Sequence, residues 1–420
     1  MKRKNNKCWI TRVIFPEFVY LCTGFHKKIE KMRTWKLSTF DLFSLGMTIK
    51  GVWIYSELPD KNVLQASLDS VIRPYPHVLG RYDEKTKSVM WSGHEEMIRL
   101  LELDRTSHST LEDIYSLVPK FDANGFKSGK KQALEAYRVV LRDGVAIVLQ
   151  GAHALMDGAT FYRIASDWGK LTAGIPVKPM TVDQTLIPDA DSLTEEQTLA
   201  RVQQLGWSKI EFRSLFRMMF NLSAMKMLKA TYTLEISQDE IRQMREKSGA
   251  GTNAVLCHYA VSKFLEKLPA KERFTLLQVA DLRGRACSVP ENFCGNFSQP
   301  AVLGEFGRDF KAADIQKAAS AILSDSKALS ETVLLSVCSS RYSLPYFMFD
   351  ASEMNSRDPK LFYVNNQLKF KACQIDFGTG MPLRTQQAML PDMIKIWQST
   401  PDGPVQIIYC GFAARIMKRN

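Results

Sequence analysis

A histidine followed four residues later by an aspartate and then a glycine carries the most informative chemistry in this sequence: His153, Asp157 and Gly158. Histidine changes charge near neutral pH, so a neutral imidazole can accept a proton from an attacking hydroxyl. Asp157 could brace the turn that presents the imidazole, and Gly158 would permit a tight backbone before a helix. This motif by itself leaves two interpretations open, a catalytic base or a structural histidine in a loop.

A second candidate group lies near the C-terminus, where Asp376, Gly378 and Gly380 share one short loop. Two glycines in one loop permit backbone angles that other residues avoid. Asp-Phe-Gly also occurs in protein kinases, but neither an HRD-type catalytic loop nor a glycine-rich phosphate loop accompanies it here. The pattern indicates an architectural loop or a coincidental turn.

Thr252 and Asn253 form a third group, because they open an expected helix directly after a Ser-Gly-Ala-Gly stretch at residues 248–251. The free N–H groups of a helix N-terminus can hold a phosphate. The alternative is an ordinary helix start in which Thr252 is the N-cap. Both interpretations remain open from the residues alone.

Two other kinds of chemistry find no support in the sequence. The eight cysteines form no CxxC pair, so we expect no metal site and interpret them as reduced thiols. The G-x-S-x-G elbow of a serine hydrolase is also missing.

The net charge of +12 is unevenly distributed along the 420 residues. Residues 1–36 carry ten Lys and Arg side chains against two acids. The rest of the chain is only mildly basic, which argues against a nucleic-acid groove but suits a phosphate-bearing co-substrate. Apolar residues make up 45% and charged residues 24%, as in ordinary globular proteins.

Residues 1–34 are interpreted as a basic extension that is disordered or serves organelle targeting. The apolar run between Cys8 and Cys22 is interrupted by Arg12, Pro16 and Glu17. It is therefore neither a secretory signal nor a spanning helix of about 20 residues. We expect a cytoplasmic protein without a transmembrane segment.

The elements around His153 can be read from hydrophobic periodicity. Two apolar runs, residues 138–141 and 145–149, flank Asp143-Gly144 and predict a hairpin that ends just before His153. Apolar side chains then recur with helical spacing on one face, at Phe161, Ile164, Ala165 and Trp168. His153 is thus expected on a strand-to-helix connection, where scaffolded loops commonly carry chemistry.

Strands and helices alternate in both halves of the chain, which predicts two mixed α/β domains. Residues 174–205 contain three prolines and few apolar clusters, and we interpret them as an interdomain linker. The expected domains are residues 35–173, which contain His153, and residues 206–420, which contain the Asp376 loop.

Five segments together resemble the BAHD acyltransferases. Residues 151–158 resemble the HxxxD motif of that family, and residues 376–382 resemble its DFGWG motif, with Thr379 in place of the usual Trp. Three further segments match the LSxxD, YPLAGR and DLRxR…FGN stretches: residues 37–41, 75–81 and 281–296. These matches span roughly residues 35–410, and Thr379 puts a plant-style substrate assignment in doubt.

The resemblance implies a mechanism and a role for each residue. His153 would deprotonate a hydroxyl or amine that then attacks the carbonyl of an acyl-CoA thioester. Asp157 would point away from the site and pair with Arg283, or failing that with Arg285. The loop of Asp376, Gly378 and Gly380 would shape the domain interface, and Thr252 and Asn253 would contact coenzyme A.

The resemblance also implies a fold and partners. We expect two similar mixed-sheet domains, as in chloramphenicol acetyltransferase, with the active-site channel between them. Acyl-CoA would be a co-substrate and no cofactor would be permanently bound. The expected partners are acyl-CoA and a small alcohol or amine, with no nucleic acid, and the protein is expected to be a monomer. Two alternatives remain: a condensation-domain-like transferase, although Ala152 stands where such domains carry a second histidine, and an inactive acyltransferase-like binding protein.

Overall fold

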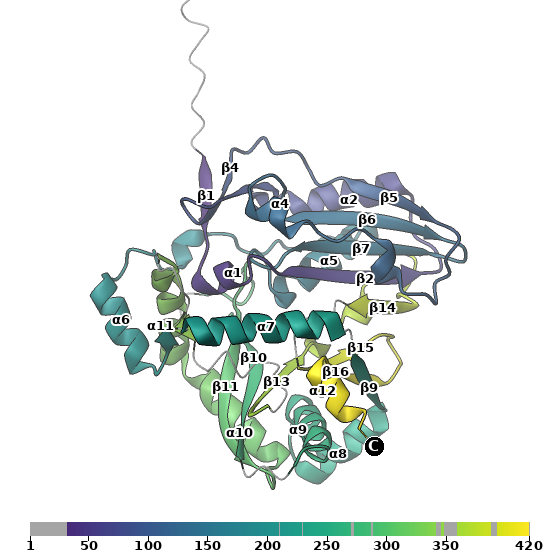
Figure 1. Ribbon diagram of the computed structural model, residues 1–420. Helices are drawn as coiled ribbons and strands as arrows, with labels where there is room; N and C mark the ends of the chain where they lie inside the picture. The colour runs from purple at the N-terminus through teal and green to yellow at the C-terminus, as the bar shows by residue number, and fades with distance from the viewer. Residues whose placement is uncertain are drawn as a thin grey trace, which may run out of the picture.

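The computed structural model describes residues 32–209, 211–228, 230–269, 273–286, 289–341, 346–347, 359–387 and 393–419. These residues form two halves, each built on a mixed sheet with helices packed against it (Figure 1). The predicted fold class is confirmed. The expected disordered extension, residues 1–34, falls almost wholly outside the described residues, except that Arg33 and Thr34 already belong to strand β1.

The first large sheet has the order β14-β2-β7-β6-β5. Its strands are β14 (Arg384–Gln387), β2 (Thr48–Tyr55), β7 (Val145–Ala152), β6 (Leu134–Leu141) and β5 (Leu100–Arg105). The predicted hairpin is present as the antiparallel pair β6–β7, while β5 and β6 run parallel. All eight residues of β7 are buried, because core clusters cover both faces of this central strand.

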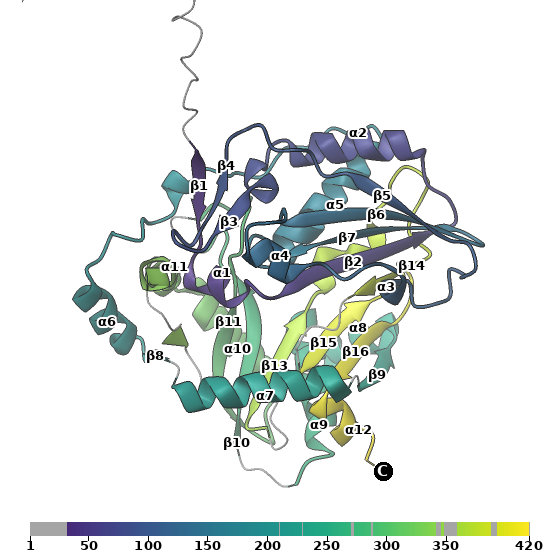
Figure 2. The ribbon, with the colours of Figure 1, turned by 45° about the horizontal axis from the view of Figure 1, so that its top comes forward.

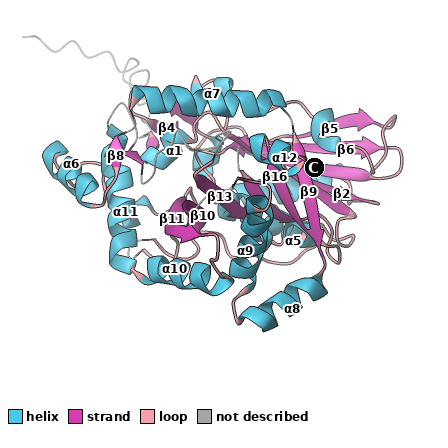
Figure 3. Ribbon diagram, turned by 60° about the horizontal axis from the view of Figure 1, so that its bottom comes forward, coloured by secondary structure: helices cyan, strands magenta, loops and turns pink. Residues whose placement is uncertain are grey.

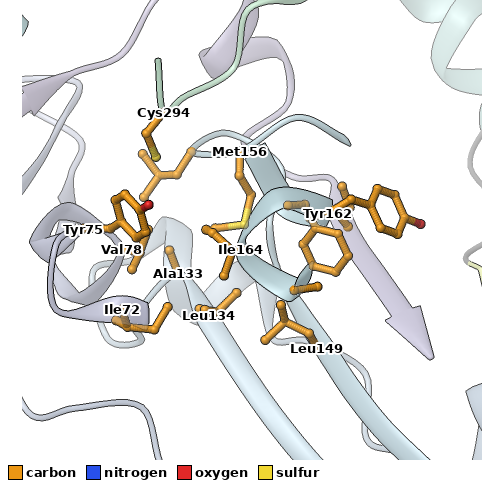
Figure 4. Close-up of a cluster of buried hydrophobic side chains, with 14 of the residues drawn as sticks. Ile72, Tyr75, Val78, Ala133, Leu134, Leu149, Met156, Tyr162, Ile164 and Cys294 are labelled. Carbon is orange, nitrogen blue, oxygen red and sulfur yellow. The ribbon is translucent and has the colours of Figure 1, made fainter. Parts of the chain in front are cut away.

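Helices α2 (Lys61–Ile72) and α5 (Gly158–Thr172) cover one face of this sheet (Figure 2). The predicted apolar face of α5 is confirmed, since Phe161, Ile164, Ala165 and Trp168 are all buried. Figure 4 shows part of the resulting core, to which Cys294 from the second half of the chain contributes. The core of the first half therefore extends across the junction between the halves.

The second large sheet has the order β11-β10-β13-β15-β16-β9. Its strands are β11 (Ser298–Gly307), β10 (Arg273–Asp281), β13 (Leu361–Asn366), β15 (Ile394–Gln398), β16 (Val405–Cys410) and β9 (Thr231–Ile236). The predicted C-terminal hairpin is present as β15–β16. Helices α8 (Gln238–Ser248), α9 (Thr252–Leu265), α10 (Ala312–Ser324) and α12 (Phe412–Met417) lie around this sheet (Figure 3).

Smaller elements complete the described chain. A three-stranded sheet joins β1 (Arg33–Lys36), β4 (Ser88–Trp91) and β3 (Arg81–Asp83), and a short pair joins β12 (Tyr346–Phe347) to β8 (Ser208–Lys209). The remaining α-helices are α1 (Thr39–Phe43), α3 (Ile114–Leu117), α4 (Ala123–Lys127), α6 (Glu195–Gln204), α7 (Phe212–Leu228) and α11 (Ser326–Cys338).

Two contacts cross the domain boundaries that the sequence suggested. Strand β14 lies inside the expected second domain, residues 206–420, yet it pairs with β2 at the edge of the first sheet. The expected linker, residues 174–205, contains helix α6 and also touches both halves, since the Met180 N–H donates to the Tyr75 hydroxyl and Thr181 forms a bridge with Phe293. Strand pairing across long sequence separations has no local signal, so neither feature could be read from composition.

Candidate active site

His153 is the first residue after β7 and stands five residues before α5 begins. Its backbone N–H donates to the Met47 carbonyl at 3.0 Å, which continues the β2–β7 pairing by one step beyond Thr48 and Ala152. The side chain is partly exposed, not sealed in the core. The strand-to-helix connection expected from the sequence therefore carries His153 as a half-buried residue, with its Nδ1 atom buried.

Asp157 is the N-cap of α5 and is 2% exposed. Its two carboxylate oxygens accept from the Nη1 and Nη2 of Arg283, at 2.8 and 3.0 Å. They also accept hydrogen bonds from three backbone N–H groups, those of Thr160, Phe297 and Ser298. A bidentate ion pair with this many hydrogen bonds fixes both partners, and it joins the His153 loop to the second half of the chain.

Arg283 follows β10 and is itself nearly buried, with a side chain 5% exposed. Besides Asp157, its guanidinium donates to the Phe293 and Gly295 carbonyls and to the Asp281 carboxylate. Burial by itself would raise the pKa of Asp157, but Arg283 and the hydrogen bonds outweigh burial and hold that pKa well below its usual range. Asp157 is therefore ionised across the physiological range and points toward Arg283, the partner implied by the resemblance.

Arg285, considered as the second choice for that pairing, lies elsewhere. Its Nη1 donates to the Asp281 carbonyl and its side chain is exposed.

Thr160 ties the start of α5 to the second half a second time. The Thr160 hydroxyl donates to the Gly295 carbonyl at 2.7 Å, and its oxygen accepts from the Gly295 N–H at 3.0 Å. Gly295 has a φ of +144°, and a Cβ there would come within 2.8 Å of the Phe297 ring. The backbone at this junction thus needs a glycine, and sequence reasoning did not single it out as a site residue.

Gly158 serves a different purpose from the one expected. Its φ is not among the positive values, so it provides no special backbone angle. A Cβ at this position would lie 2.7 Å from the ring of Phe370, which comes from the second half and stacks on Tyr162. The glycine is required because another segment approaches closely, and the motif's spacing could not reveal that segment.

The loop of Asp376, Gly378 and Gly380 lies at the other end of α5. The Asp376 carboxylate accepts the N–H groups of both glycines, at 2.7 and 2.9 Å, and the glycines have φ values of +93° and +105°. The backbone oxygen of Asp376 lies so close to Gly169 of α5 that a Cβ there would come within 2.4 Å. Since α5 has 15 residues, this loop and His153 are separated by about 20 Å of helix.

Phe377 and Thr379 attach this loop to the first half. The Phe377 ring is buried and packs edge-on against Trp168 and Tyr55. The Thr379 hydroxyl donates to the Glu57 carbonyl at 3.0 Å. Thr379, the residue that departs from the DFGWG motif, therefore attaches the loop to the first half through one hydrogen bond.

A cavity of about 300 Å³ lies in the second half, beside the ends of β10 and β13. Its lining includes Thr252, Asn253, Arg285 and Lys369, but His153 is not among the lining residues. Lys369 Nζ donates to Asp281, which also accepts from Arg283. The cavity is thus connected to the Asp157 network through the single carboxylate of Asp281.

Thr252 and Asn253 both line this cavity, but Thr252 is not the N-cap of α9. The N-cap is Gly251, and no side chain caps the helix. Asn253 donates to Gln278 and accepts from Asn366, so its amide is held at the cavity wall. An uncapped helix start with Arg285 and Lys369 nearby has the electrostatics to bind a phosphate. Sequence reasoning missed Lys369, which carries no motif.

Two further histidines, His77 and His258, occupy packed positions. His77 stacks on Trp35 with ring centroids 4.3 Å apart, and burial lowers its pKa to about 3. His258 contacts the Phe310 carbonyl through Nε2 at 3.1 Å. Neither belongs to the network around His153 and Asp157.

The described residues include neither a candidate metal-binding cluster nor a candidate membrane-spanning helix. No group of three or more His, Cys, Asp or Glu side chains in this part of the chain could hold a metal ion. No helix within the described ranges has the length and apolar character needed to cross a membrane.

Comparison with known proteins identifies the family. The model of the family described as "Transferase family" matches residues 26–395, which is most of the chain. A search of curated protein sequences found no match.

Solved structures show the same fold at low sequence identity. TRI101 of F. sporotrichioides, solved in complex with coenzyme A and T-2, has a TM-score of 0.68 at 14% identity, and the match covers 92% of this chain and 97% of that one. Vinorine synthase has a TM-score of 0.62 at 15% identity, with 92% of each chain covered. A condensation domain of the calcium-dependent antibiotic synthetase has a TM-score of 0.57 at 12% identity, covering 92% of this chain and 96% of its own.

The family match, together with a two-sheet fold shared with TRI101 and vinorine synthase, shows that this chain belongs to the BAHD family of acyl-CoA-dependent acyltransferases.

Proposed function

We propose that this protein transfers an acyl group from a coenzyme A thioester to the hydroxyl or amine of a small molecule, with His153 as the general base. The observation that carries the proposal is the position of the half-buried His153 on a loop that is fixed by the buried Asp157–Arg283 pair at the junction of the halves. A loop held this firmly can keep an imidazole in one orientation, which general base catalysis requires.

The proposed reaction has two steps. The imidazole of His153 takes the proton from the acceptor as its oxygen or nitrogen attacks the thioester carbonyl. The tetrahedral intermediate then collapses, the bond from carbon to sulfur breaks, and the protonated imidazole returns the proton to the coenzyme A thiolate. No covalent intermediate with the protein is required, so neither a nucleophilic serine nor a cysteine is needed.

Asp157 has a positioning role in this proposal. All five groups bound to its carboxylate are donors, and none of them is His153. It fixes the start of α5, and through α5 the turn that carries the imidazole. We propose an architectural role for Asp376, Gly378 and Gly380 as well, because their loop binds the far end of the same helix.

Coenzyme A is proposed to occupy the cavity lined by Thr252 and Asn253. In support, the lining combines an uncapped helix start with Arg285 and Lys369, and TRI101, which has a similar fold, was solved in complex with coenzyme A. Phosphate groups are stabilised by such donors and cations. Coenzyme A would be a co-substrate that leaves after each turnover.

A thiol-release assay tests the base. Acetyl-, malonyl-, aromatic and long-chain acyl-CoA donors are each combined with a mixture of alcohols and amines. We expect His153→Ala to lower kcat by roughly 10²–10⁴-fold, while His108→Ala, at a half-exposed histidine beside Glu112, leaves kcat unchanged. Coenzyme A binding without any turnover in the wild type would instead identify an inactive binding protein.

The proposed coenzyme A site has its own test. Lys369→Ala should raise KM for the acyl-CoA donor by roughly tenfold, the loss expected for one charge-assisted hydrogen bond to a phosphate. Lys263→Ala is the matched control, because Lys263 pairs with Glu266 on α9 and does not line the cavity. Equal KM values in the two variants would place the donor elsewhere.

We further propose that the protein acts as a monomer in the cytosol. Light scattering on the purified chain should give the 47.7 kDa of one copy.

A further inference from the structure

Helix α7 (Phe212–Leu228) carries apolar side chains that face away from the protein. Phe212, Phe216, Met219 and Phe220 are 76%, 67%, 55% and 56% exposed. No Phe outside α7 belongs to the exposed large hydrophobic residues of the described chain. Exposed aromatic side chains gathered on one element mark an interaction surface, whereas scattered ones do not.

These four residues occupy one face of the helix. Their positions follow the spacing i, i+4, i+7 and i+8, so they form a single stripe along the axis. Met218 and Asn221 lie on another side and are buried, which shows that the helix rests on the protein by that side. In Figures 1 and 2 α7 runs in front of the second sheet, and in Figure 3 it lies at the edge of the molecule.

The stripe has a cationic border. Arg213 and Arg217 each follow one of the exposed phenylalanines, and both are exposed themselves. The 17 residues of α7 include no Asp or Glu. A helix with an aromatic face, adjoining arginines and no acids is typical of helices that lie in a membrane interface.

We propose that α7 docks this protein onto an anionic lipid bilayer, with the stripe of Phe212, Phe216, Met219 and Phe220 inserted among the acyl chains and Arg213 and Arg217 on the lipid phosphates. Charge complementarity selects this occupant. A second copy of the chain would bring the same arginines and a net charge of +12 toward this face, and the basic residues 1–31 would do likewise. The protein would bind at the surface and not span the bilayer.

Vesicle flotation with the full chain tests the proposal. The vesicles are phosphatidylcholine alone, or phosphatidylcholine with roughly one quarter phosphatidylserine. We expect the wild type to float with the anionic vesicles and more weakly with the neutral ones. The double variant Phe216→Ser, Phe220→Ser should have a partition coefficient into the vesicles roughly 100-fold lower than that of the wild type. Each aromatic side chain that is no longer buried in the bilayer accounts for about tenfold of this loss.

The arginines have a separate signature. Arg213→Gln with Arg217→Gln should weaken binding to the anionic vesicles by roughly fivefold per charge and leave binding to the neutral vesicles unchanged. Raising the salt concentration should remove most of the difference between wild type and variant on anionic vesicles.

A double variant elsewhere on the surface is the matched control. Leu111 and Ile175 are 82% and 53% exposed and lie outside α7, so Leu111→Ser with Ile175→Ser should float like the wild type. Phe212→Ser, the change at the most exposed of the phenylalanines, serves as a second variant if the Phe216 and Phe220 pair lowers the melting temperature.

Three results would overturn the proposal. The first is a wild type that floats with neither kind of vesicle, and the second is α7 variants that float as well as the wild type. The third is a dimer in light scattering without lipid that Phe212→Ser converts to a monomer, since a second copy would then occupy the stripe.

Discussion

Replacing Asp157 by Asn tests whether this carboxylate positions the His153 loop or relays a proton. In the positioning role, the change should destabilise the protein and lower its rate together. Each oxygen of Asp157 accepts from one Arg283 nitrogen and from at least one backbone N–H. Because all five partners donate hydrogens, the NH₂ group of Asn must face donors in either orientation.

The size of the effect follows from burial. Asp157 is 2% exposed and the Arg283 side chain 5%, so the guanidinium would stay charged in a nearly dry site after the carboxylate is gone. Removing one partner of such a pair costs about 3–5 kcal/mol. Folded domains have only about 5–15 kcal/mol of stability, so Asp157→Asn should lose a large part of it and express partly as insoluble protein.

Denaturation in urea, followed by tryptophan fluorescence, measures the loss of unfolding free energy, and thiol release measures kcat. Asp167→Asn is the matched control, because Asp167 is a buried acid on the same helix whose basic partners, Arg163 and Lys170, are 43% and 48% exposed and so remain in contact with water. We expect the control to lose less stability and keep its kcat. A fully stable Asp157→Asn protein without turnover would refute the positioning role and favour a relay.

Three further changes test other parts of the structure. Burial raises the pKa of Asp41 to about 7, although hydrogen bonds from Ser38 lower it. The folded state therefore binds the proton of the Asp41 carboxyl more tightly than the unfolded state does. Between pH 4 and pH 8, the unfolding free energy of the wild type should fall by up to about 4 kcal/mol relative to that of Asp41→Asn. Urea denaturation measures both pH profiles, and parallel profiles would contradict this expectation. Gly158→Ala should cost about 1 kcal/mol in thermal unfolding through contact with Phe370, and the cost should vanish when Phe370→Ala is also present. Asp376→Ala should lose about 1 kcal/mol, because the two loop N–H groups are exposed and water replaces the lost carboxylate, while kcat of the folded enzyme stays near that of the wild type; a selective loss of kcat would place the loop in the chemistry.

Residues 151–158 show which structural features a sequence motif can predict and which it cannot. Spacing alone correctly placed His153 between a buried strand and an amphipathic helix, because alternation and helical periodicity are local properties of the chain. The reason for Gly158 was wrong, since it depends on Phe370, more than two hundred residues away. Thr252 shows the same limit, because whether it or Gly251 caps α9 depends on backbone angles that the residue types do not fix.

The sequence by itself determined the hairpins, the helices around His153 and, through five matching segments, the acyltransferase family. Each of these features depends on residues close together in the chain, so hydrophobic periodicity and motif spacing predict it directly. Only the tertiary structure decided that β14 joins the first sheet, that Arg283 rather than Arg285 binds Asp157, and that Lys369 lines a cavity with Thr252. Those contacts join residues far apart in the chain, and burial of the whole core, not local preference, selects among them.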